Sequence, residues 1–230
     1  MCFMVLRCQN HHRPAPRICM SGIRTKDNTH EPRKRPAQAR SRATVDAIVE
    51  AAAQVFAVLG HAQTTTDGIA ERAGVSIGTL YQYFPNKDAL LVALFERHLA
   101  EVEVHFQALC HTLGNANTDE AVTDMVQRLY ALHRSSPALH RIFIETAPLP
   151  ARLLESYRAL EHGLRSAWTA HLHDLVPEPA AVATMLTSLA ETLAHRYTLY
   201  PAGDLDPTTV EAESITLLKA YLTAHRRSDE

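Results

Sequence analysis

A short run of uncharged polar side chains, from position 76 to position 83, has the chemistry to contact a nucleic acid. The hydroxyl groups of Ser76, Thr79 and Tyr83 can donate hydrogen bonds to phosphate oxygens. The amide of Gln82 can pair with the edge of an adenine, and Gly78 permits close approach to a base pair because it has no side chain. These residue types favour a helix that lies in the major groove of DNA.

Two short helices joined by a tight turn are the elements that must position these side chains. Thr65 or Thr66 can cap the first helix, because a side-chain oxygen there accepts a backbone N–H. Gly74 is expected to end that helix, since glycine adopts the left-handed conformation at little cost. Ser76 can cap the second helix, and Pro85 stops it because proline has no N–H to donate. The pattern predicts a helix-turn-helix.

The outward face of the second helix is expected to carry the DNA contacts. It has no charge and consists of small, hydroxyl, amide and aromatic residues, namely Ile77, Gly78, Thr79, Gln82 and Tyr83, with Tyr81 at its margin. Lys87 lies at the start of the next helix, where a cation and free backbone N–H groups can bind an anion together. The alternative is an ordinary helix pair with a polar outer surface. The turn, the capping residues, the uncharged outer face and Lys87 all agree with DNA binding.

The string I-A-x-x-A-G-V-S-x-G-T-L-Y-x-Y-F-x-N-K-x-x-L, which begins at Ile69, resembles the DNA-binding signature of the TetR/AcrR family of bacterial transcriptional regulators. The resemblance covers roughly residues 40–103, and beyond them extends only to the family's general helical plan. It implies an all-α homodimer whose C-terminal domain binds a small effector and releases operator DNA. By position it implies phosphate contacts from Thr66, Ser76, Tyr83 and Lys87, and groove contacts from Ile77, Gly78, Thr79, Tyr81 and Gln82.

Two residues depart from what this resemblance leads us to expect. Gly68 lies inside the first helix of the motif and is expected to cost about 1 kcal/mol relative to alanine. Asp67 is acidic where some members of the family place a base-reading residue. We therefore expect no DNA contact from Asp67.

Charge is distributed unevenly along the 230 residues. Residues 1–42 carry a net charge of +8 and residues 43–230 a net charge of −10. We expect residues 1–38 to form a disordered basic arm that supplies phosphate neutralisation; the alternative is a solvated tail with no role. No stretch approaches the ~20 apolar residues of a membrane span, and no signal-peptide pattern is present. The expected location is the cytoplasm, at the nucleoid, with no membrane partner.

Apolar residues recur at helical spacing through the rest of the chain, so the predicted fold class is all-α. A helix from about Ser41 to Leu59 should complete a three-helix DNA-binding domain over residues 39–86. The remaining residues, 87–230, are expected to form a helical domain for effector binding and dimerisation. Its helices are predicted at 86–111, 118–135, 137–146, 151–175, from about 179, and at 209–225.

The second domain is expected to hold a small, largely apolar or aromatic effector between its helices. The candidate pocket residues are His105, Phe106, Arg141, Glu145, Tyr157, Trp168 and His195. Its last two helices carry a wide apolar stripe that could join a partner copy in a four-helix bundle. The candidate interface residues are Val182, Met185, Leu186, Leu189, Leu193, Leu217 and Tyr221. The alternative is that both helices simply cover the core of one chain.

Fourteen histidines and four cysteines raise the question of metal or catalytic sites. There is no H-E-x-x-H motif, and the pairs Glu101/His105 and Glu191/His195 have the spacing of ordinary helix contacts. Three of the cysteines lie in the basic tail, a pattern that does not form a disulfide framework. A Gly-rich phosphate loop and a G-x-S-x-G elbow are also missing. We predict no metal site, no cofactor and no catalytic residues.

The favoured hypothesis is a homodimeric, sequence-specific transcriptional regulator that binds a palindromic DNA operator. A two-fold pair of helix-turn-helix motifs reads two half-sites about one helical turn apart. The small effector would release this repressor from DNA. The alternative is a DNA-binding protein of the same fold that a protein partner controls, or that organises the nucleoid, without an effector.

Overall fold

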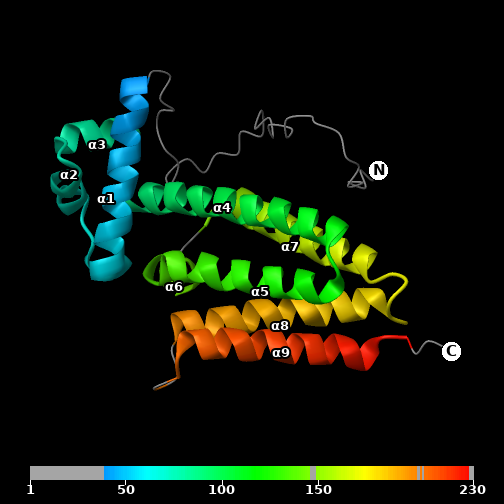
Figure 1. Cartoon of the computed structure of the whole chain (residues 1–230). Helices are drawn as coiled ribbons and strands as arrows, with labels where there is room; N and C mark the ends of the chain where they lie inside the picture. The colour runs from blue at the N-terminus through cyan, green and yellow to red at the C-terminus, as the bar shows by residue number, and fades with distance from the viewer. Residues whose placement is uncertain (1–38, 146–148, 201–202, 204, 228–230) are drawn as a thin grey trace, which may run out of the picture.

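The computed structural model describes residues 39–145, 149–200, 203 and 205–227, and for residues 39, 40, 144 and 145 only the backbone. This part of the chain contains helices and no strand, which confirms the all-α prediction (Figure 1). The helices are α1 (Ala39–Gln63), α2 (Thr66–Ala73), α3 (Ile77–Tyr83), α4 (Lys87–Asn115), α5 (Thr118–Ser135), α6 (Pro137–Glu145), α7 (Ala151–His171), α8 (Pro179–Leu199) and α9 (Pro207–His225). The basic arm predicted at residues 1–38 lies outside the described residues.

The helix-turn-helix forms as its capping residues predict. Thr65, rather than Thr66, caps α2, and its Oγ1 accepts a hydrogen bond of 3.2 Å from the backbone N–H of Gly68. Gly74 ends the helix with a φ of 67°, in the left-handed region that glycine adopts without strain. Ser76 caps α3, and its Oγ accepts from the backbone N–H of Thr79 at 3.1 Å. The turn between α2 and α3 is therefore fixed by local chemistry.

Several helix boundaries differ from the sequence prediction. Helix α1 continues past its predicted end at Leu59 to Gln63, across a kink at Gly60, whose φ of 68° is not helical. Helix α4 continues to Asn115 because Gly114 is accommodated within it, and a capping box between Asn117 and Glu120 then begins α5. Helix α7 ends at His171, four residues before the predicted end, and a turn follows. Helix α9 begins earlier than predicted, at Pro207, because Asp206 caps it. These differences arise from caps and turns and leave the order of the helices unchanged.

The apolar residues gather in three clusters, and α4 contributes to all of them. One cluster joins α1, α2 and α3 to the start of α4 and to α6 through residues such as Phe56, Leu80 and Leu139. A second joins the far end of α4 to α5, α7, α8 and α9 around Trp168, and a third joins the middle of α4 to α7. Figure 1 shows α4 running from the α1–α3 end along the length of the other helices. It is a continuous rod between the two ends of the molecule.

The junction between α1 and α4 is closed by polar contacts. The Nζ of Lys87 donates to the backbone carbonyls of His61, Ala62 and Thr64, at 2.7, 3.2 and 3.1 Å. The His61 ring lies 2.7 Å from the carboxylate of Asp88. The end of α1 is thereby held on the first turn of α4, where lysine meets the unpaired carbonyls of a helix end.

One stretch of α1, Ser41–Gln63, is long and apolar enough to cross a membrane by length and composition alone. The sequence had suggested no such stretch, because its apolar content comes largely from alanine. In the structure Ile48, Ala52 and Phe56 of this helix are fully buried against α2, α3 and α4. A core helix passes the same test, so the finding is weak evidence for a membrane.

Candidate nucleic-acid interface and effector cavity

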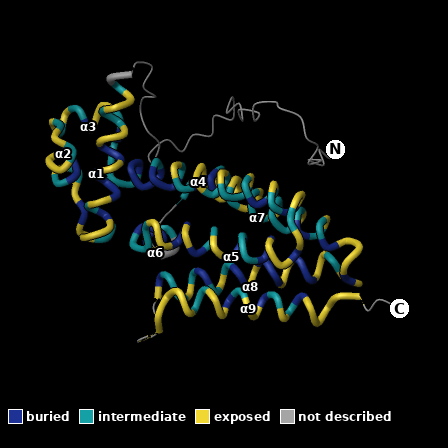
Figure 2. The backbone as a smooth tube through the Cα atoms, viewed as in Figure 1, coloured by how far each residue is buried: buried dark blue, intermediate teal, exposed yellow. Residues whose placement is uncertain are grey.

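The outer face of α3 exposes a subset of the residues that the sequence placed there. Figure 2 shows exposed and half-buried stretches along α3. Ser76, Gly78, Tyr81 and Gln82 are exposed, and Thr79 is half-buried. The remaining two, Ile77 and Tyr83, are also half-buried and pack against the core of α1, α2 and α3. They therefore attach α3 to the core and also border its outer face.

Hydroxyl groups on this face form hydrogen bonds with one another, which fix their positions. Ser76 Oγ lies 2.8 Å from Thr79 Oγ1 at the start of α3. Tyr81 OH lies 3.0 Å from Thr66 Oγ1, which links α3 to the first residue of α2. Either oxygen of each pair can be the donor, so a phosphate oxygen can receive the hydrogen that remains. The arrangement groups four of the predicted DNA-contacting residues in one polar surface.

Lys87 is placed differently from the sequence prediction. Its ammonium group donates to three carbonyls at the end of α1, and these bonds use all of its N–H donors. A phosphate contact by Lys87 remains a prediction, and it requires that one of these carbonyls be exchanged for a phosphate oxygen.

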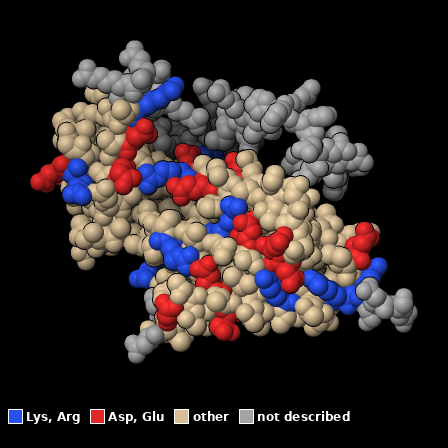
Figure 3. Space-filling model, viewed as in Figure 1, with Lys and Arg blue, Asp and Glu red and all other residues tan. Residues whose placement is uncertain are grey.

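The charge around the helix-turn-helix is not basic. Residues 64–86 contain the acidic Asp67 and Glu71 and one basic residue, Arg72, whose Nε donates to Gln54 of α1 at 2.8 Å. Over the long helices, acidic and basic side chains are interspersed on the face shown in Figure 3. The helix-turn-helix itself therefore offers little positive charge to DNA, and a contribution from the flanking basic residues remains a prediction.

A cavity of about 320 Å³ lies between α4, α5, α6, α7 and α8. Its wall is largely apolar and includes Val102, Phe106, Leu109, Met125, Leu129, Leu132, Leu160 and Leu164. Four of the predicted pocket residues line it: His105, Phe106, Tyr157 and His195. Apolar walls with a few polar groups are typical of small-molecule sites.

Three of the predicted pocket residues do not line this cavity. Trp168 is fully buried in the core that joins the far end of α4 to α5, α7, α8 and α9, and it does not line the cavity. Arg141 is exposed, donates to the backbone carbonyl of Leu199 at 2.6 Å and lies over the ring of Tyr200. Glu145 is the last residue of α6, and its side chain lies outside the described part. The assignments of Trp168 and Arg141 to the pocket were therefore wrong.

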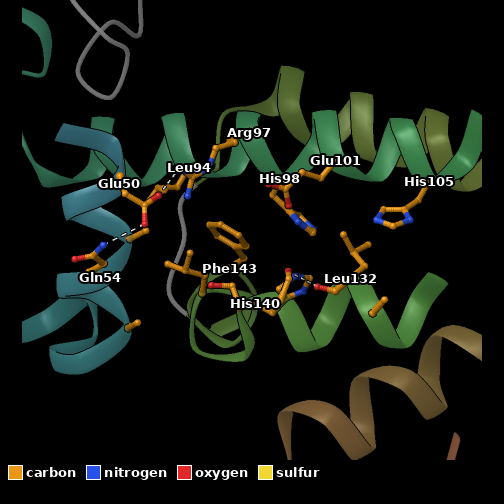
Figure 4. A pocket seen from close by; sticks show the side chains of 16 residues that line it. Glu50, Gln54, Leu94, Arg97, His98, Glu101, His105, Leu132, His140 and Phe143 are labelled. Carbon is orange, nitrogen blue, oxygen red and sulfur yellow. Dashed lines mark hydrogen bonds and ion pairs between the residues drawn. The ribbon is translucent and has the colours of Figure 1, made fainter. Parts of the chain in front are cut away.

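A second hollow, of about 530 Å³, lies between α1, α4, α5 and α6 (Figure 4). At its α1 side Arg97 of α4 forms an ion pair of 3.1 Å with Glu50. His98 of α4 and His140 of α6 project into it from opposite sides. Both histidines also line the cavity described above, so the two hollows share a wall. That wall lies between the 320 Å³ cavity and α1.

Of the four histidines that gather beside this wall, sequence reasoning named only His195 and missed the other three. His98, His133, His140 and His195 come from α4, α5, α6 and α8, and no local spacing relates them. Burial, together with the nearby His133 and His195, lowers the pKa of His98 to about 4, although Glu191 opposes the shift. Burial likewise lowers the pKa of His140 and of His195. These three rings are therefore neutral near pH 7, with a nitrogen lone pair available.

The acidic groups beside the histidines respond in opposite ways. Burial opposes ionisation of Glu191, but His133, His195 and His98 together hold its pKa below the usual range. Burial raises the pKa of Glu161, and the charge of Glu191 adds to this effect. Burial also raises the pKa of Tyr157, which faces both carboxylates. The polar end of the cavity thus combines the carboxyl groups of Glu161 and Glu191 with imidazole rings and a phenol.

The predicted dimer surface divides between buried and exposed residues. Val182 and Leu186 are buried in the core of the chain itself, so their assignment to an intermolecular surface was wrong. Met185, Leu189 and Leu217 are 50%, 37% and 52% exposed, whereas Leu193 and Tyr221 are half-buried. The division follows helical spacing. Val182 and Leu186 lie four residues apart on the inward face of α8, whereas Met185 and Leu189 lie on the adjacent, outward face. An apolar surface remains on α8 and α9.

Comparisons with known proteins agree with this architecture. The family model described as "Bacterial regulatory proteins, tetR family" matches residues 48–94, and the model "Tetracyclin repressor-like, C-terminal domain" matches residues 118–222. Among curated relatives, the "Fatty acid metabolism regulator protein" of Bacillus subtilis is 41% identical over 54 residues, 24% of this chain and 28% of that protein. The "Nucleoid occlusion factor SlmA" of Mannheimia succiniciproducens is 30% identical over 146 residues, 57% of this chain and 64% of that protein. The matches thus span less than two thirds of these relatives.

Solved structures show the same fold. A regulator of the TetR family from Mesorhizobium loti is similar with a TM-score of 0.65, at 19% identity, over 83% of this chain and 100% of that one. FadR from Bacillus subtilis, solved in complex with stearoyl-CoA, is similar with a TM-score of 0.56, at 18% identity, over 75% of this chain and 96% of that one. With two family models matched in order along the helix-turn-helix and the helices behind it, the chain belongs to the TetR/AcrR family of DNA-binding transcriptional regulators, which are transcription factors and not enzymes.

Proposed function

We propose that this protein is a homodimeric repressor that leaves a palindromic operator when a small, largely apolar molecule enters the cavity between α4 and α8. Residues 39–86 would bind DNA, and residues 87–230 would bind the effector and the partner copy, in the cytoplasm at the nucleoid. The nine contacts assigned to Thr66, Ser76–Thr79, Tyr81–Tyr83 and Lys87 form part of this proposal.

The observation that carries the proposal is that the cavity shares its walls with helices that contact α1. Helix α4 lines the cavity with Val102 and Phe106, and its first residue, Lys87, is bonded to the end of α1. Helix α6 lines the cavity with His140, and its Leu139 and Ile142 belong to the core of α1–α3. A ligand that favours one position of α4 or α6 would alter the spacing of the two recognition helices.

Chemical complementarity indicates the class of effector. The apolar wall would bind an alkyl chain or a ring, and the polar groups at Tyr157, Glu191 and the histidines would orient it. The cavity is at the lower end of the usual range for ligand sites, which favours a compact molecule or a chain of medium length. A related fold has been solved with stearoyl-CoA, so acyl compounds belong in the first panel of probes.

The test is release of operator DNA by fluorescence anisotropy, with genomic fragments that the purified protein retains as the labelled probe. Medium-chain acyl compounds and small aromatic acids are added, and an effector is expected to weaken DNA binding at least fivefold. Leu160→Trp should fill the cavity and abolish the response while leaving DNA binding intact. Leu154→Trp, on the same helix but 37% exposed and away from the cavity, is the matched control. Operator affinity that no bound probe changes would contradict the proposal.

The alternative without an effector has support from the relatives named nucleoid occlusion factor SlmA. It makes a different prediction in the same assay. DNA affinity would be indifferent to every probe, and Leu160→Trp would behave as the wild-type protein does. The response of that one variant therefore separates the two readings.

Dimerisation is expected to use the exposed apolar residues of α8 and α9. Leu217→Lys places a charge in the middle of that surface and is expected to convert a dimer into a monomer, because an unpaired buried charge is costly. Val104→Lys changes an equally exposed apolar residue on α4, which lies on the other side of the molecule from α9 (Figure 1). Light scattering after gel filtration should give twice 25.5 kDa for the wild-type protein and for Val104→Lys. A dimer that survives Leu217→Lys would contradict this surface.

A further inference from the structure

Three imidazole rings meet at the polar end of the cavity in a geometry that suits a metal ion. His133, His140 and His195 each offer one nitrogen, and these three atoms all lie within 4.8 Å of one another. The ring centroids of His133 and His195 are 4.2 Å apart, and those of His133 and His140 are 4.7 Å apart. His133 and His140 are buried and His195 is half-buried. No pair of these residues is neighbouring in sequence, so the fold brings them together.

The hydrogen bonds of His133 identify which of its nitrogens is available. Its Nδ1 lies 2.6 Å from the backbone carbonyl of Leu129, and because a carbonyl only accepts, Nδ1 must carry the hydrogen. In the neutral ring Nε2 is then a lone pair. That atom is fully buried and has no hydrogen-bond partner in the described part of the chain. A helix carbonyl that fixes the tautomer in this way is the usual arrangement behind a histidine ligand.

A carboxylate completes the electron-rich surroundings. Glu191 Oε1 lies 3.6 Å from Nε2 of His133 and 3.5 Å from Nε2 of His195. In the neutral His133 ring the lone pair of Nε2 thus faces the negative charge of Glu191, and a cation between them would satisfy both. Protons could neutralise the carboxylate's charge, but several imidazolium rings this close together would repel one another. One divalent ion can accept all the lone pairs at once.

We propose that His133, His140 and His195 bind a divalent transition-metal ion of the Zn²⁺, Co²⁺ or Ni²⁺ type, with Glu191 as the fourth ligand. Neutral imidazole and carboxylate are the donors that these ions take, whereas Mg²⁺ and Ca²⁺ require oxygen ligands. A tetrahedral Zn²⁺ with bonds of about 2.0–2.1 Å needs nitrogens roughly 3.4 Å apart. Small rotations of the side chains close the present separations to that value.

The position of His140 gives such an ion a regulatory consequence, which rests on the proposed function. His140 lies on α6 between Leu139 and Ile142, which pack in the core of α1–α3. The other ligands lie on α5 and α8, in the body of the cavity. A bound metal would therefore fasten α6 to α5 and α8, and would fix the helix on which α1 rests. Linkage then requires that metal and operator change each other's affinity.

Cobalt absorption tests the site in the full-length protein. After treatment with a chelator and its removal, Co²⁺ is expected to give visible ligand-field bands that saturate in proportion to the protein. His195→Gln, the half-buried ligand and the least disruptive to change, should weaken Co²⁺ binding by at least about tenfold. Glu191→Gln should weaken it as well. His162→Gln, exposed on α7, is the matched control and should bind Co²⁺ as the wild-type protein does.

The same comparison distinguishes the proposed site from other groups in the chain that can bind Co²⁺. The tail contains Cys2, Cys8 and Cys19 together with three histidines, which are present in every variant. Their contribution cancels in the difference between wild type and His195→Gln. Circular dichroism of each variant shows whether it is folded. Loss of the bands in folded His195→Gln supports the site, and equal binding in wild type, His195→Gln and Glu191→Gln overturns it.

A separate measurement of operator affinity tests whether the metal regulates DNA binding. Zn²⁺ is added to the operator complex, with wild type and His195→Gln, and a change in affinity of at least fivefold is expected only for wild type. Co²⁺ binding without any change in operator affinity would retain the site and refute its regulatory role. Release of DNA by an apolar probe in a protein that binds no metal would refute the metal site and leave the proposed function intact.

Discussion

Replacing Gly78 by leucine is expected to weaken operator binding by roughly ten- to a hundredfold while the fold remains as stable as before. Gly78 is exposed on α3, and a Cβ at this position would have only Ser76 Oγ near it, at 3.8 Å. The protein therefore has room for a side chain here. A base pair that lies against the helix does not, and an overpacked contact costs about 1–3 kcal/mol, where each 1.4 kcal/mol is roughly tenfold in affinity.

Gly78→Ala tests the effect of this glycine on stability without the bulk of leucine. Glycine in a helix costs about 0.5–1 kcal/mol relative to alanine, so Gly78→Ala should raise the free energy of unfolding by about this amount. The control is Gly114→Leu, in the last turn of α4, where a Cβ would meet nothing within 4 Å. It should leave DNA binding unchanged.

The measurements are fluorescence anisotropy with labelled operator at a fixed salt concentration, and urea denaturation. If Gly78→Leu binds the operator as tightly as Gly114→Leu does, α3 does not approach DNA at residue 78. The recognition face would then have to be reassigned.

Replacing Trp168 by alanine is expected to lower the free energy of unfolding by about 3–5 kcal/mol, because it removes the largest fully buried side chain and leaves a cavity. Trp168 lies in the core shared with Leu172, Leu186 and Leu218. Its Nε1 has no hydrogen-bond partner among the described residues, so Trp168→Phe loses volume but no hydrogen bond. The phenylalanine variant should therefore lose much less stability.

Denaturation has to be followed by circular dichroism, since Trp168 is the single tryptophan of the chain. A loss below about 1 kcal/mol in Trp168→Ala would mean that the core around α7 is loosely packed. The same residue also reports on the cavity in an indirect way. Because Trp168 does not line it, a ligand there would change the tryptophan fluorescence only by moving α7 or α8.

The sequence was sufficient for the elements whose determinants are local. Thr65, Gly74 and Ser76 act on backbone groups within a few residues, so the helix-turn-helix could be predicted together with its turn. The core stripe of α1 follows from helical periodicity in the same way. Helix ends such as that of α7 were less predictable, because a turn after a helix and one further helical turn differ little in free energy.

The residues around the cavity depend on contacts between helices, and there the sequence was a poor guide. Trp168 and Tyr157 lie on one helix and both are aromatic, but the rotation of α7 sends the first to the core and the second to the cavity. His133 and His140 were unremarkable in sequence because their ligating partners come from other helices. Only the packing of α5, α6 and α8 reveals that these rings share a site.

The Lys87 ammonium has no hydrogen left for a further acceptor. It has three hydrogens, and each is already given to a carbonyl at the end of α1. A phosphate oxygen that takes one of them leaves a carbonyl without its donor and loosens the corner between α1 and α4. DNA binding by Lys87 would thus weaken the hydrogen bonds that hold the end of α1 on the start of α4. A regulator that binds a phosphate through Lys87 would therefore be more flexible at that corner on DNA than when it is free.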